Sequence, residues 1–325
     1  MSEQQAPLVS VRDLRKHYPL NGGLLRKGVA VKAVDGVSFD IQPGETFGLV
    51  GESGCGKSTL GRAILRLFDI TSGEIHFAGQ AIAHAREREL KPLRKRMQAI
   101  FQDPYSSLNP GMTVRQLVAE PMQIHGYSRE EQRERTETLL YKVGLKHEHL
   151  ERFPHEFSGG QRQRISIARA LSVHPEFVLC DEPLSALDVS VQAQVVNILQ
   201  DLQQELGLTY LFIAHELSMV RHISSRIGVM YLGKLVEVAP ANELYQRPAH
   251  PYTRALLAAV PQPDPRIRNL EDATLRGEMP GPTSALPGCK FCSRCPHAMP
   301  VCQTQEPAMQ EIAPGHFAAC WLFKM

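Results

Sequence analysis

The feature that most constrains the fold of this chain is a short apolar run that ends directly in a glycine-rich loop. The run from Thr46 to Val50 is nearly uncharged and suits a buried central strand. The next residues are Gly51-Glu52-Ser53-Gly54-Cys55-Gly56-Lys57-Ser58-Thr59. Glycines at these spacings let successive backbone N–H groups surround phosphate oxygens, where side chains would obstruct them. A buried strand followed by such a loop predicts an α/β protein with a phosphate-binding loop.

The side chains beside these glycines suit a nucleotide with bound magnesium. Lys57 offers a cation to the β- and γ-phosphates, Ser58 offers a hydroxyl to Mg²⁺, and a helix that begins here directs its positive end at the nucleotide. Cys55 is interpreted as a small residue tolerated in a turn, since nothing else in the sequence pairs with it. The loop residues expected to contact the nucleotide are Gly51, Ser53, Gly54, Cys55, Gly56, Lys57, Ser58 and Thr59.

Hydrophobic periodicity indicates alternating strands and helices on both sides of the loop. Two early segments alternate apolar and polar residues, which predicts antiparallel strands, and two later short apolar runs are typical of buried strands. The segment from Val114 to Lys146 has helical spacing. The four expected strands are at Val9 to Leu14, Val37 to Ile41, Phe177 to Leu179 and Tyr210 to Ile213.

The character of the chain changes beyond about Pro261. Proline, glycine and cysteine become frequent there, and periodicity disappears. We therefore predict an α/β domain at 1–260 and a separate extension at 261–325.

The composition is that of a globular protein with no polyelectrolyte partner. Of 325 residues, 43% are apolar, and 36 Lys and Arg stand against 34 Asp and Glu. The first residues, Met1 to Pro7, lack the basic start and apolar stretch of an export signal. No run approaches the ~18 uncharged apolar residues that cross a bilayer. The sequence predicts a cytosolic protein that acts at a membrane only through a partner.

A second motif follows the strand expected near Phe177. The residues Phe177-Val178-Leu179-Cys180-Asp181-Glu182 form an apolar run that ends in two carboxylates. Near a phosphate-binding loop, Asp181 can hold Mg²⁺ directly or through water, and Glu182 can polarise an attacking water. Taken alone, such a pair is usually a helix cap or a solvated turn. The residues upstream decide between these interpretations.

Those upstream residues are Phe157-Ser158-Gly159-Gly160-Gln161, followed by Arg162-Gln163-Arg164. Two adjacent glycines at a helix start make a second backbone site for an anion, because the first N–H groups of a helix have no partner within it. Such a site can hold the γ-phosphate of a nucleotide. The pattern therefore favours a catalytic role for the two carboxylates.

The order and spacing of these elements resemble an ATP-binding cassette (ABC) ATPase from about residue 8 to 250. Ser158-Gly159-Gly160-Gln161 is similar to the signature sequence of that family, and Asp181-Glu182 is similar to the end of its Walker B strand. Ser185-Ala186-Leu187-Asp188 is similar to its D-loop. Phe157 departs from the commoner leucine before the signature.

Three single residues complete this resemblance. Gln102 stands at the place of the Q-loop glutamine, and His215 stands at that of the switch histidine. Tyr18 falls where the family has an aromatic residue that stacks on adenine. The resemblance implies that His215 contacts the γ-phosphate and helps to orient Glu182 and the attacking water.

The resemblance also implies a fold and a dimer. The expected fold is α/β, with a RecA-like core, an antiparallel β subdomain and a helical subdomain at about 103–157, followed by a small Cys-rich C-terminal extension. Two cassettes would dimerise head to tail, so that each ATP lies between the phosphate-binding loop of one chain and the signature of the other. The implied catalytic residues are Glu182, His215 and Gln102. The implied nucleotide contacts outside the loop are Tyr18, Gln102, Ser158, Gly160, Gln161, Asp181 and Asp188, and the implied Mg²⁺ contacts are Ser58, Gln102 and Asp181.

Further stretches narrow the resemblance to the ATPase subunits of dipeptide and oligopeptide importers. They are residues 101–110, residues 250–257 and the tail from Gly277 to Cys320, while the extra residues Asn21 to Gly28 are similar to the F-type subunit. The implied partners are a second homologous ATPase, two transmembrane permease subunits and a periplasmic or extracellular peptide-binding protein. The implied location is peripheral, at the cytoplasmic face of the cell membrane. Nickel importers share much of this pattern and remain an alternative.

A rival class is the ABC ATPases that act on nucleic acid or ribosomes. Those usually carry two cassettes in one chain or a long coiled coil between the phosphate-binding loop and the signature. Here only about a hundred residues separate Lys57 from Ser158, and the near-neutral charge gives no basic footprint. We therefore expect no nucleic-acid partner. A third class, a non-catalytic regulatory cassette, is disfavoured by the presence of Glu182 and His215.

Five cysteines crowd into the tail, at positions 289, 292, 295, 302 and 320. In a reducing cytosol such a cluster indicates metal binding before it indicates disulfides. Four of these thiols, without a pair of CxxC knuckles, fit an iron–sulfur cluster at least as well as zinc. A zinc site that uses some of the cysteines with His297 or His316 is the alternative, and thiols without any metal are a third possibility.

The corresponding tail of peptide importers resembles a region that binds a 4Fe–4S cluster. The match implies Cys289, Cys295, Cys302 and Cys320 as ligands and leaves Cys292 outside the set. A tail rich in proline and glycine has little core of its own, so a metal would fix how it packs. The expected role is structural or regulatory, with no part in ATP chemistry.

Overall fold

The computed structural model describes residues 6–20, 30–215, 217–259, 279–281 and 286–323. These residues divide into two compact units, between which the chain passes several times. The first unit contains the described residues of Met1–Leu8, Ile41–Thr46 and His84–Ala214. The second contains those of Val9–Asp40, Phe47–Ala83 and His215–Met325. The glycine-rich loop therefore lies in the second unit, and the signature sequence and the carboxylate pair lie in the first.

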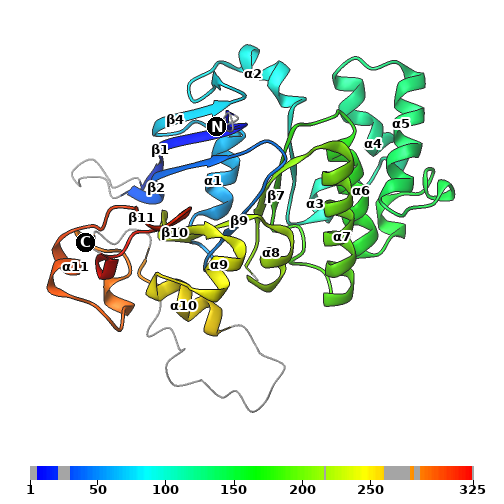
Figure 1. Ribbon diagram of the computed structural model, residues 1–325. Helices are drawn as coiled ribbons and strands as arrows, with labels where there is room; N and C mark the ends of the chain where they lie inside the picture. Colours follow the sequence, from blue (N-terminus) through cyan, green and yellow to red (C-terminus); the bar gives the residue numbers. More distant parts are fainter. Residues whose placement is uncertain (1–5, 21–29, 216, 260–278, 282–285, 324–325) are drawn as a thin grey trace, which may run out of the picture. The chain divides into compact units, whose positions relative to one another are not determined.

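The second unit contains an antiparallel four-stranded sheet, as the alternating pattern predicts. Its strands are, in order, β2 (Ala30–Ile41), β1 (Val9–Pro19), β4 (Ser72–Phe77) and β5 (Gln80–Ala81). Val9 of β1 stands opposite Phe77 of β4, Val11 stands opposite Ile75, and all four side chains are buried. Because alternate residues of a strand face opposite sides, this register places one apolar face on the core. Helix α1 (Lys57–Ile64) packs against β1 (Figure 1).

A second set of strands in this unit joins the glycine-rich loop to the C-terminal extension. In order, they are β11 (Gln310–Ala313), β12 (His316–Ala318), β10 (Lys234–Pro240), β9 (Arg226–Tyr231) and β3 (Thr46–Val50). β3 pairs parallel with β9, and all five of its residues are buried, as its uncharged sequence predicts. The hairpin of β11 and β12 adds to β10, where Glu237 stands opposite Ala318. The extension thus continues the sheet of β10 and covers its edge.

Short helices complete the second unit. Helices α9 and α10 follow β10 directly, and the helical turns of the extension lie beside them (Figure 1). Pro251 begins α10, a position that suits proline because the first helical N–H has no partner within the helix. The helices and turns are α8 (Leu217–Ile223), α9 (Ala241–Gln246), α10 (Pro251–Ala258), η3 (Cys292–Arg294), α11 (Pro300–Thr304) and η4 (Trp321–Phe323).

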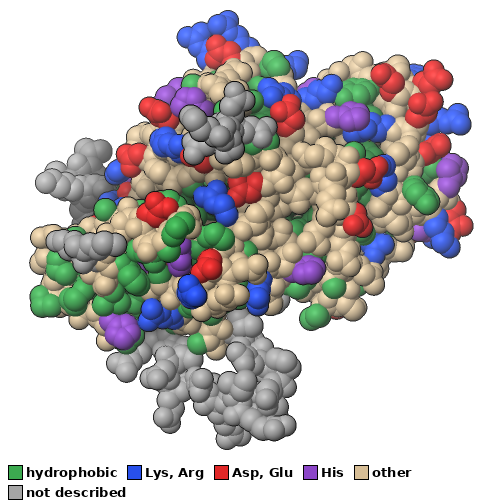
Figure 2. All heavy atoms as spheres, in the orientation of Figure 1, with side chains coloured by type: hydrophobic (Ala, Val, Ile, Leu, Met, Phe, Trp, Pro, Cys, Tyr) green, Lys and Arg blue, Asp and Glu red, His purple; other side chains and the backbone are tan. Residues whose placement is uncertain are grey.

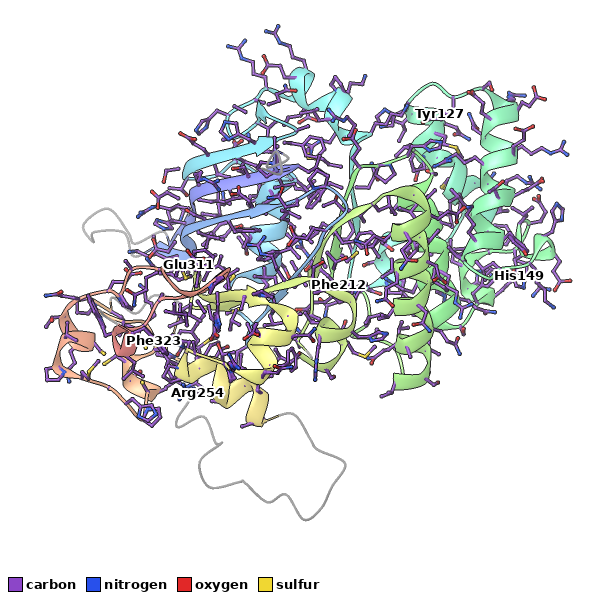
Figure 3. The ribbon with its side chains drawn as sticks, in the orientation of Figure 1. Tyr127, His149, Phe212, Arg254, Glu311 and Phe323 are labelled. Carbon is purple, nitrogen blue, oxygen red and sulfur yellow. The ribbon has the colours of Figure 1, made fainter. Side chains whose placement is uncertain are left out.

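The first unit is built on three parallel strands. In order, they are β8 (Thr209–Ile213), β7 (Phe177–Asp181) and β6 (Met97–Ile100). Ile100 stands opposite Cys180, and Asp181 stands opposite Ile213, so the carboxyl ends of the strands share one edge. All residues of β7 and β8 are buried, including Phe212 (Figure 3). Both strands lie where the sequence predicts them.

The helices of the first unit include the segment predicted as helical from Val114 to Lys146. The structure divides this segment into two helices, because Gly126 has a left-handed φ of 77° and Ser128 begins a new helix with a capping box to Glu131. Tyr127 marks the break in Figure 3 and packs on the cluster that contains Met122. The helices and turns are α2 (Glu87–Arg94), α3 (Pro104–Ser107), α4 (Val114–Ile124), α5 (Arg129–Lys142), η1 (His147–His149), η2 (Pro154–Glu156), α6 (Gly159–Leu171) and α7 (Val189–Leu206).

Two sequence predictions concern residues that the structure does not describe. The predicted boundary near 261 and the extra residues Asn21 to Gly28 both lie outside the described ranges. The boundary remains a prediction. Among the helices within the described ranges, none combines the length and the hydropathy needed to cross a membrane.

Candidate functional site

The glycine-rich loop follows β3 and curls tightly over the surrounding backbone. Gly56 has a φ of 108°, and a Cβ there would lie 2.0 Å from the carbonyl oxygen of Ala33. A Cβ on Gly51 would lie 2.2 Å from the carbonyl oxygen of Met230. Both positions exclude any side chain, so glycine is required by space as well as by φ. The loop ends at α1, whose first residue is Lys57.

Lys57 is buried and folds back over this loop. Its Nζ donates hydrogen bonds to the carbonyl oxygens of Gly51 at 2.8 Å and Glu52 at 3.2 Å. The same Nζ lies 3.4 Å from Nδ1 of His215. The structure therefore brings together two residues, 158 positions apart in sequence, that were separately predicted to contact the γ-phosphate.

Glu52, the second residue of the loop, is held from two other directions. Its N–H donates to the hydroxyl of Tyr252 at 2.9 Å. Its carboxylate accepts hydrogen bonds from both terminal nitrogens of Arg294, at 2.7 and 3.0 Å. This bond with Glu52 is the main reason that the pKa of Arg294 lies above its usual range. Sequence reasoning missed Tyr252 and Arg294, because no local pattern connects them with the loop.

Two other predicted nucleotide contacts have distinct surroundings. Cys55 is buried, and burial raises the pKa of its thiol, which agrees with a small residue packed in a turn. Tyr18, in β1, is partly exposed and meets the ring of Phe68 edge to face at 6.3 Å. The ammonium of Lys16 lies 4.8 Å from the centre of the Tyr18 ring. Tyr18 thus keeps an accessible aromatic surface of the kind that base stacking uses.

In the first unit, the two carboxylates end β7 as the sequence predicts. Asp181 and Glu182 are both buried. Glu182 has a φ of 52°, and its N–H donates to the carbonyl oxygen of Ile213 at 3.0 Å. Its own carbonyl oxygen accepts from the hydroxyl of Ser185 at 3.1 Å. A non-glycine residue in the left-handed region costs about 1–3 kcal/mol, and such strain concentrates at functional sites.

Gln102 lies at the same edge of this parallel sheet. It comes two residues after β6 ends at Ile100, which pairs with Cys180, and its side chain is exposed. The residue after it, Asp103, caps α3 by accepting from the N–H of Tyr105 at 2.8 Å. The structure thus gathers Gln102, Asp181 and Glu182 at the carboxyl ends of neighbouring strands, where α/β proteins bind ligands.

The signature sequence begins α6 as predicted. Ser158 is the N-cap: its hydroxyl accepts from the N–H of Gln161 at 3.3 Å, and the Gln161 side chain accepts from the N–H of Ser158 at 3.1 Å. This capping box holds the helix start in place. A Cβ on Gly160 would lie 2.4 Å from Cγ1 of Val191, so glycine lets α6 approach α7 closely.

Asp188, predicted to contact nucleotide, has a structural role in this chain. It is the N-cap of α7, and its carboxylate accepts from the N–H of Val191 at 3.0 Å and from the hydroxyl of Ser190 at 2.6 Å. The bond from Ser190 is the main cause that lowers the pKa of Asp188. The residue therefore fixes the turn that joins the carboxylate pair to α7.

The cysteines of the extension gather loosely. All are free thiols, Cys302 is buried, and the others are partly buried. Burial and the neighbouring thiols of Cys295, Cys302 and Cys320 raise the pKa of Cys289 to about 12. Burial and the thiols of Cys320, Cys302 and Cys292 raise the pKa of Cys295.

The predicted four-thiol metal site is not formed in the described part of the chain. No group of three or more His, Cys, Asp or Glu side chains there is arranged to hold a metal ion. Hydrophobic side chains gather over the extension on the face in Figure 2. In the described residues, the only support for an iron–sulfur cluster is therefore the chemistry of the thiols and their electrostatic influence on one another.

His316, a nitrogen ligand in the zinc alternative, has another partner. Its Nε2 lies 2.7 Å from Oε1 of Glu237, and both side chains are buried. The Glu237 carboxylate also accepts the N–H groups of Ala249 and His250, each at 2.8 Å. A buried carboxylate with three hydrogen-bond partners is a structural tie between β10, β12 and α10.

Comparison with known proteins agrees with this fold and these motifs. Residues 34–185 match the family described as "ABC transporter", and residues 236–302 match "Oligopeptide/dipeptide transporter, C-terminal region". The fold and the site are those of an ABC-type ATPase. The oligopeptide transport ATP-binding proteins AppF and OppF of Bacillus subtilis are 52% and 51% identical to the chain. The matches cover 98% of both chains for AppF and 96% of both for OppF. The chain therefore belongs to the ABC transporter ATP-binding family, in the branch with an oligopeptide/dipeptide transporter C-terminal region.

Solved structures show the same fold. The chain is similar to the ATP-binding cassette MJ0796, solved as a dimer bound to ADP and Pi, with a TM-score of 0.65 and 28% identity over 72% of this chain and 98% of that one. It is also similar to cbiO1 of Clostridium perfringens, with a TM-score of 0.66 and 26% identity over 75% of this chain and 92% of that one.

Proposed function

We propose that this chain is the ATP-hydrolysing subunit of an importer of dipeptides or oligopeptides. The observation that carries the proposal is the loop in which Lys57 meets His215, within a chain that is similar over almost its whole length to oligopeptide transport ATP-binding proteins. The Lys57 ammonium donates to two loop carbonyl oxygens. When ATP binds, its phosphate oxygens would replace these carbonyl oxygens as acceptors of the Lys57 ammonium. The N–H groups of the loop would surround the same phosphate oxygens.

Binding of ATP uses the second unit first. The loop residues Gly51, Ser53, Gly54, Cys55, Gly56 and Thr59 offer their backbone N–H groups, Ser58 offers a hydroxyl to Mg²⁺, and Tyr18 offers its ring to adenine. Bound Mg²⁺ neutralises charge on the phosphates. Asp181 and Gln102 are the proposed further oxygen ligands of this Mg²⁺.

Hydrolysis depends on positioning, without a covalent intermediate. Glu182 holds and polarises the attacking water, and His215 contacts the γ-phosphate. The turn that follows β7 fixes the Glu182 backbone through bonds to Ile213 and Ser185. Such preorganisation supports a role in which the carboxylate has little freedom to move.

The active form is a head-to-tail dimer with a second, homologous ATPase subunit. The capped start of α6, with Ser158, Gly160 and Gln161, presents helix N–H groups to the ATP that is bound by the partner. Asp188 holds the adjoining turn. Two permease subunits and a peptide-binding protein outside the membrane complete the transporter, and the chain acts at the cytoplasmic face. No feature of its charge favours nucleic acid.

A 4Fe–4S cluster in the extension is part of this proposal. Its support is the group of partly or fully buried thiols in the extension, where burial and neighbouring thiols raise the pKa values of Cys289, Cys295 and Cys320. Cys292 also acts on Cys295, so the choice of Cys289, Cys295, Cys302 and Cys320 as ligands rests on the resemblance to peptide importers. Loading requires these thiols to deprotonate and to move closer together. Anaerobically purified protein should absorb near 400 nm, Cys302→Ser should abolish this absorption, and Cys292→Ser should keep it. Colourless protein with stoichiometric zinc would replace the cluster with the zinc alternative.

The test of the ATPase role is Glu182→Gln in the assembled transporter. This substitution keeps the side-chain volume and removes the base, so ATP should remain bound while turnover falls by about 10²–10⁴-fold. Full turnover in the variant would remove Glu182 from the proposed role. Turnover by the isolated chain at the rate of the complex would instead refute the dimer.

A further inference from the structure

The C-terminal extension reaches directly into the phosphate-binding loop. Arg294 lies in the helical turn η3, between Cys292 and Cys295, and its guanidinium forms the bidentate ion pair with Glu52. The two residues are 242 positions apart in the sequence and belong to the same compact unit. The Arg294 side chain is only 5% exposed and that of Glu52 is 23% exposed. A buried, bidentate pair of this kind is much stronger and more directional than a surface pair.

Packing around Arg294 holds its guanidinium in place. The N–H of Arg294 donates to the carbonyl oxygen of Phe291 at 3.0 Å, and its Nη1 lies 3.4 Å from the hydroxyl of Tyr231. The ring of Phe291 is buried against Tyr231 at 5.3 Å and Tyr252 at 5.4 Å. The extension is therefore anchored by three aromatic rings beside the loop.

Glu52 connects this anchor to the lysine of the loop. Its N–H is held by Tyr252, its carboxylate by Arg294, and its carbonyl oxygen accepts from Nζ of Lys57. All three groups of Glu52 thus have partners, so the position of its backbone depends on the extension. A shift of Glu52 would move the carbonyl that holds the lysine and the N–H groups that follow it.

Charge gives Arg294 a second effect on the loop. Glu52 puts a carboxylate in a loop that receives the negative phosphates of ATP, and like charges at short range oppose binding. Arg294 neutralises this carboxylate with a cation that does not lose its proton. Without Arg294, the negative charge of Glu52 would remain in the loop, only partly screened by solvent.

We propose that Arg294 is a positioning residue of the ATP site, which orients the phosphate-binding loop through Glu52 and neutralises its carboxylate. The inference rests on the proposed function, because it assumes that this loop binds ATP. The extension then completes the nucleotide site of its own chain. Its flanking cysteines, Cys292 and Cys295, place any change in the thiol cluster within one or two residues of the ion pair.

A double-mutant cycle on the full chain separates this role from a purely structural one. The variants are Arg294→Met, Glu52→Gln and the two together, with Mg-ATP affinity measured by calorimetry at fixed ionic strength. Arg294→Met should raise the Kd for ATP about tenfold, the change that 1.4 kcal/mol produces. The double variant should return to within about threefold of wild type, because Glu52→Gln removes the uncompensated charge. In the assembled transporter, Arg294→Met should raise KM for ATP and leave kcat within about twofold.

Arg12→Met is the matched control. Arg12 pairs with Asp40 at 2.7 Å in the same unit, and its side chain also donates to the carbonyl oxygens of Val11 and Phe39, so its loss should leave the Kd for ATP unchanged. Arg294→Lys keeps the positive charge but loses the bidentate geometry, so its Kd for ATP should lie between those of wild type and Arg294→Met. This variant also tests the inference if Arg294→Met folds poorly.

Several results would overturn the inference. They are unchanged ATP affinity in Arg294→Met and Arg294→Lys, a double variant as weak as Arg294→Met, or an equal loss in Arg12→Met. Wild-type protein that fails to bind ATP would instead refute the proposed function. The two failures are therefore distinguishable.

Discussion

The left-handed backbone of Glu182 allows a comparison of two variants that differ only in one methyl group. Both Glu182→Ala and Glu182→Gly remove the carboxylate, so both should lower ATP turnover by at least ~10²-fold. At ordinary positions, alanine is the more stable of the two by about 0.5–1 kcal/mol, because glycine loses more backbone entropy on folding. At a φ of 52°, alanine bears a strain of about 1–2 kcal/mol that glycine does not. The balance predicts that the glycine variant is the more stable by roughly 0.5–1 kcal/mol.

Thermal unfolding of the two purified variants at one scan rate measures this difference. For a chain of this size, a change of about 1 kcal/mol shifts the Tm by roughly 2 °C, so Glu182→Gly should melt a degree or two above Glu182→Ala. An alanine variant that melts at the same temperature or higher would show that the turn is not strained. If both variants lose turnover and Glu182→Gly has the higher Tm, the result would support backbone strain at Glu182, beside the reacting water.

Three further predictions concern packing and protonation. Gly160→Ala should destabilise the protein by about 1–3 kcal/mol in thermal unfolding, and Val191→Ala in the same chain should restore most of this loss, because the new methyl group meets Val191 at 2.4 Å. Phe291→Ala should cost about 3–5 kcal/mol of local stability and speed limited proteolysis of the extension, whereas unchanged cleavage would argue against its anchoring role. Burial lowers the pKa of His250 to about 4, so the unfolded state takes up the proton first. Stability should therefore fall by roughly 1 kcal/mol from pH 7.5 to 5.5, and His250→Gln should remove this part of the dependence.

The sequence alone was sufficient to predict features that depend on a short, contiguous stretch of residues. The phosphate-binding loop requires glycine at Gly51 and Gly56, and the structure shows that a Cβ at either would overlap a carbonyl oxygen. The buried run before the loop and the run that ends in Asp181 were both found as strands. These signals are short and contiguous, and therefore visible in one sequence.

One segment with predicted helical spacing contains a break that spacing alone does not predict, although the signal for it was present. The segment from Val114 to Lys146 was predicted from helical spacing alone, and the structure ends one helix before Gly126 and begins another after Ser128. Ser128 and Glu131 form a capping box, which is a recognisable start signal. Helical spacing alone does not show where one helix ends and the next begins.

The contacts that matter most to the extension could not be read from the sequence. Arg294 meets Glu52 across 242 residues, and His316 meets Glu237 across 79. Neither pair has a fixed spacing, since each depends on how the extension adds to the sheet of β10. For the same reason, a histidine that suited a zinc site by sequence proved to be the partner of a buried carboxylate.

The most direct test of the account is ATP-driven uptake of a labelled peptide into proteoliposomes that contain the complete transporter. We predict uptake that requires ATP on the side of this chain and that falls to background with Glu182→Gln, while ATP remains bound to the variant. Peptide uptake that continues with Glu182→Gln, or ATP turnover in the wild-type complex without uptake of any peptide, would contradict the account.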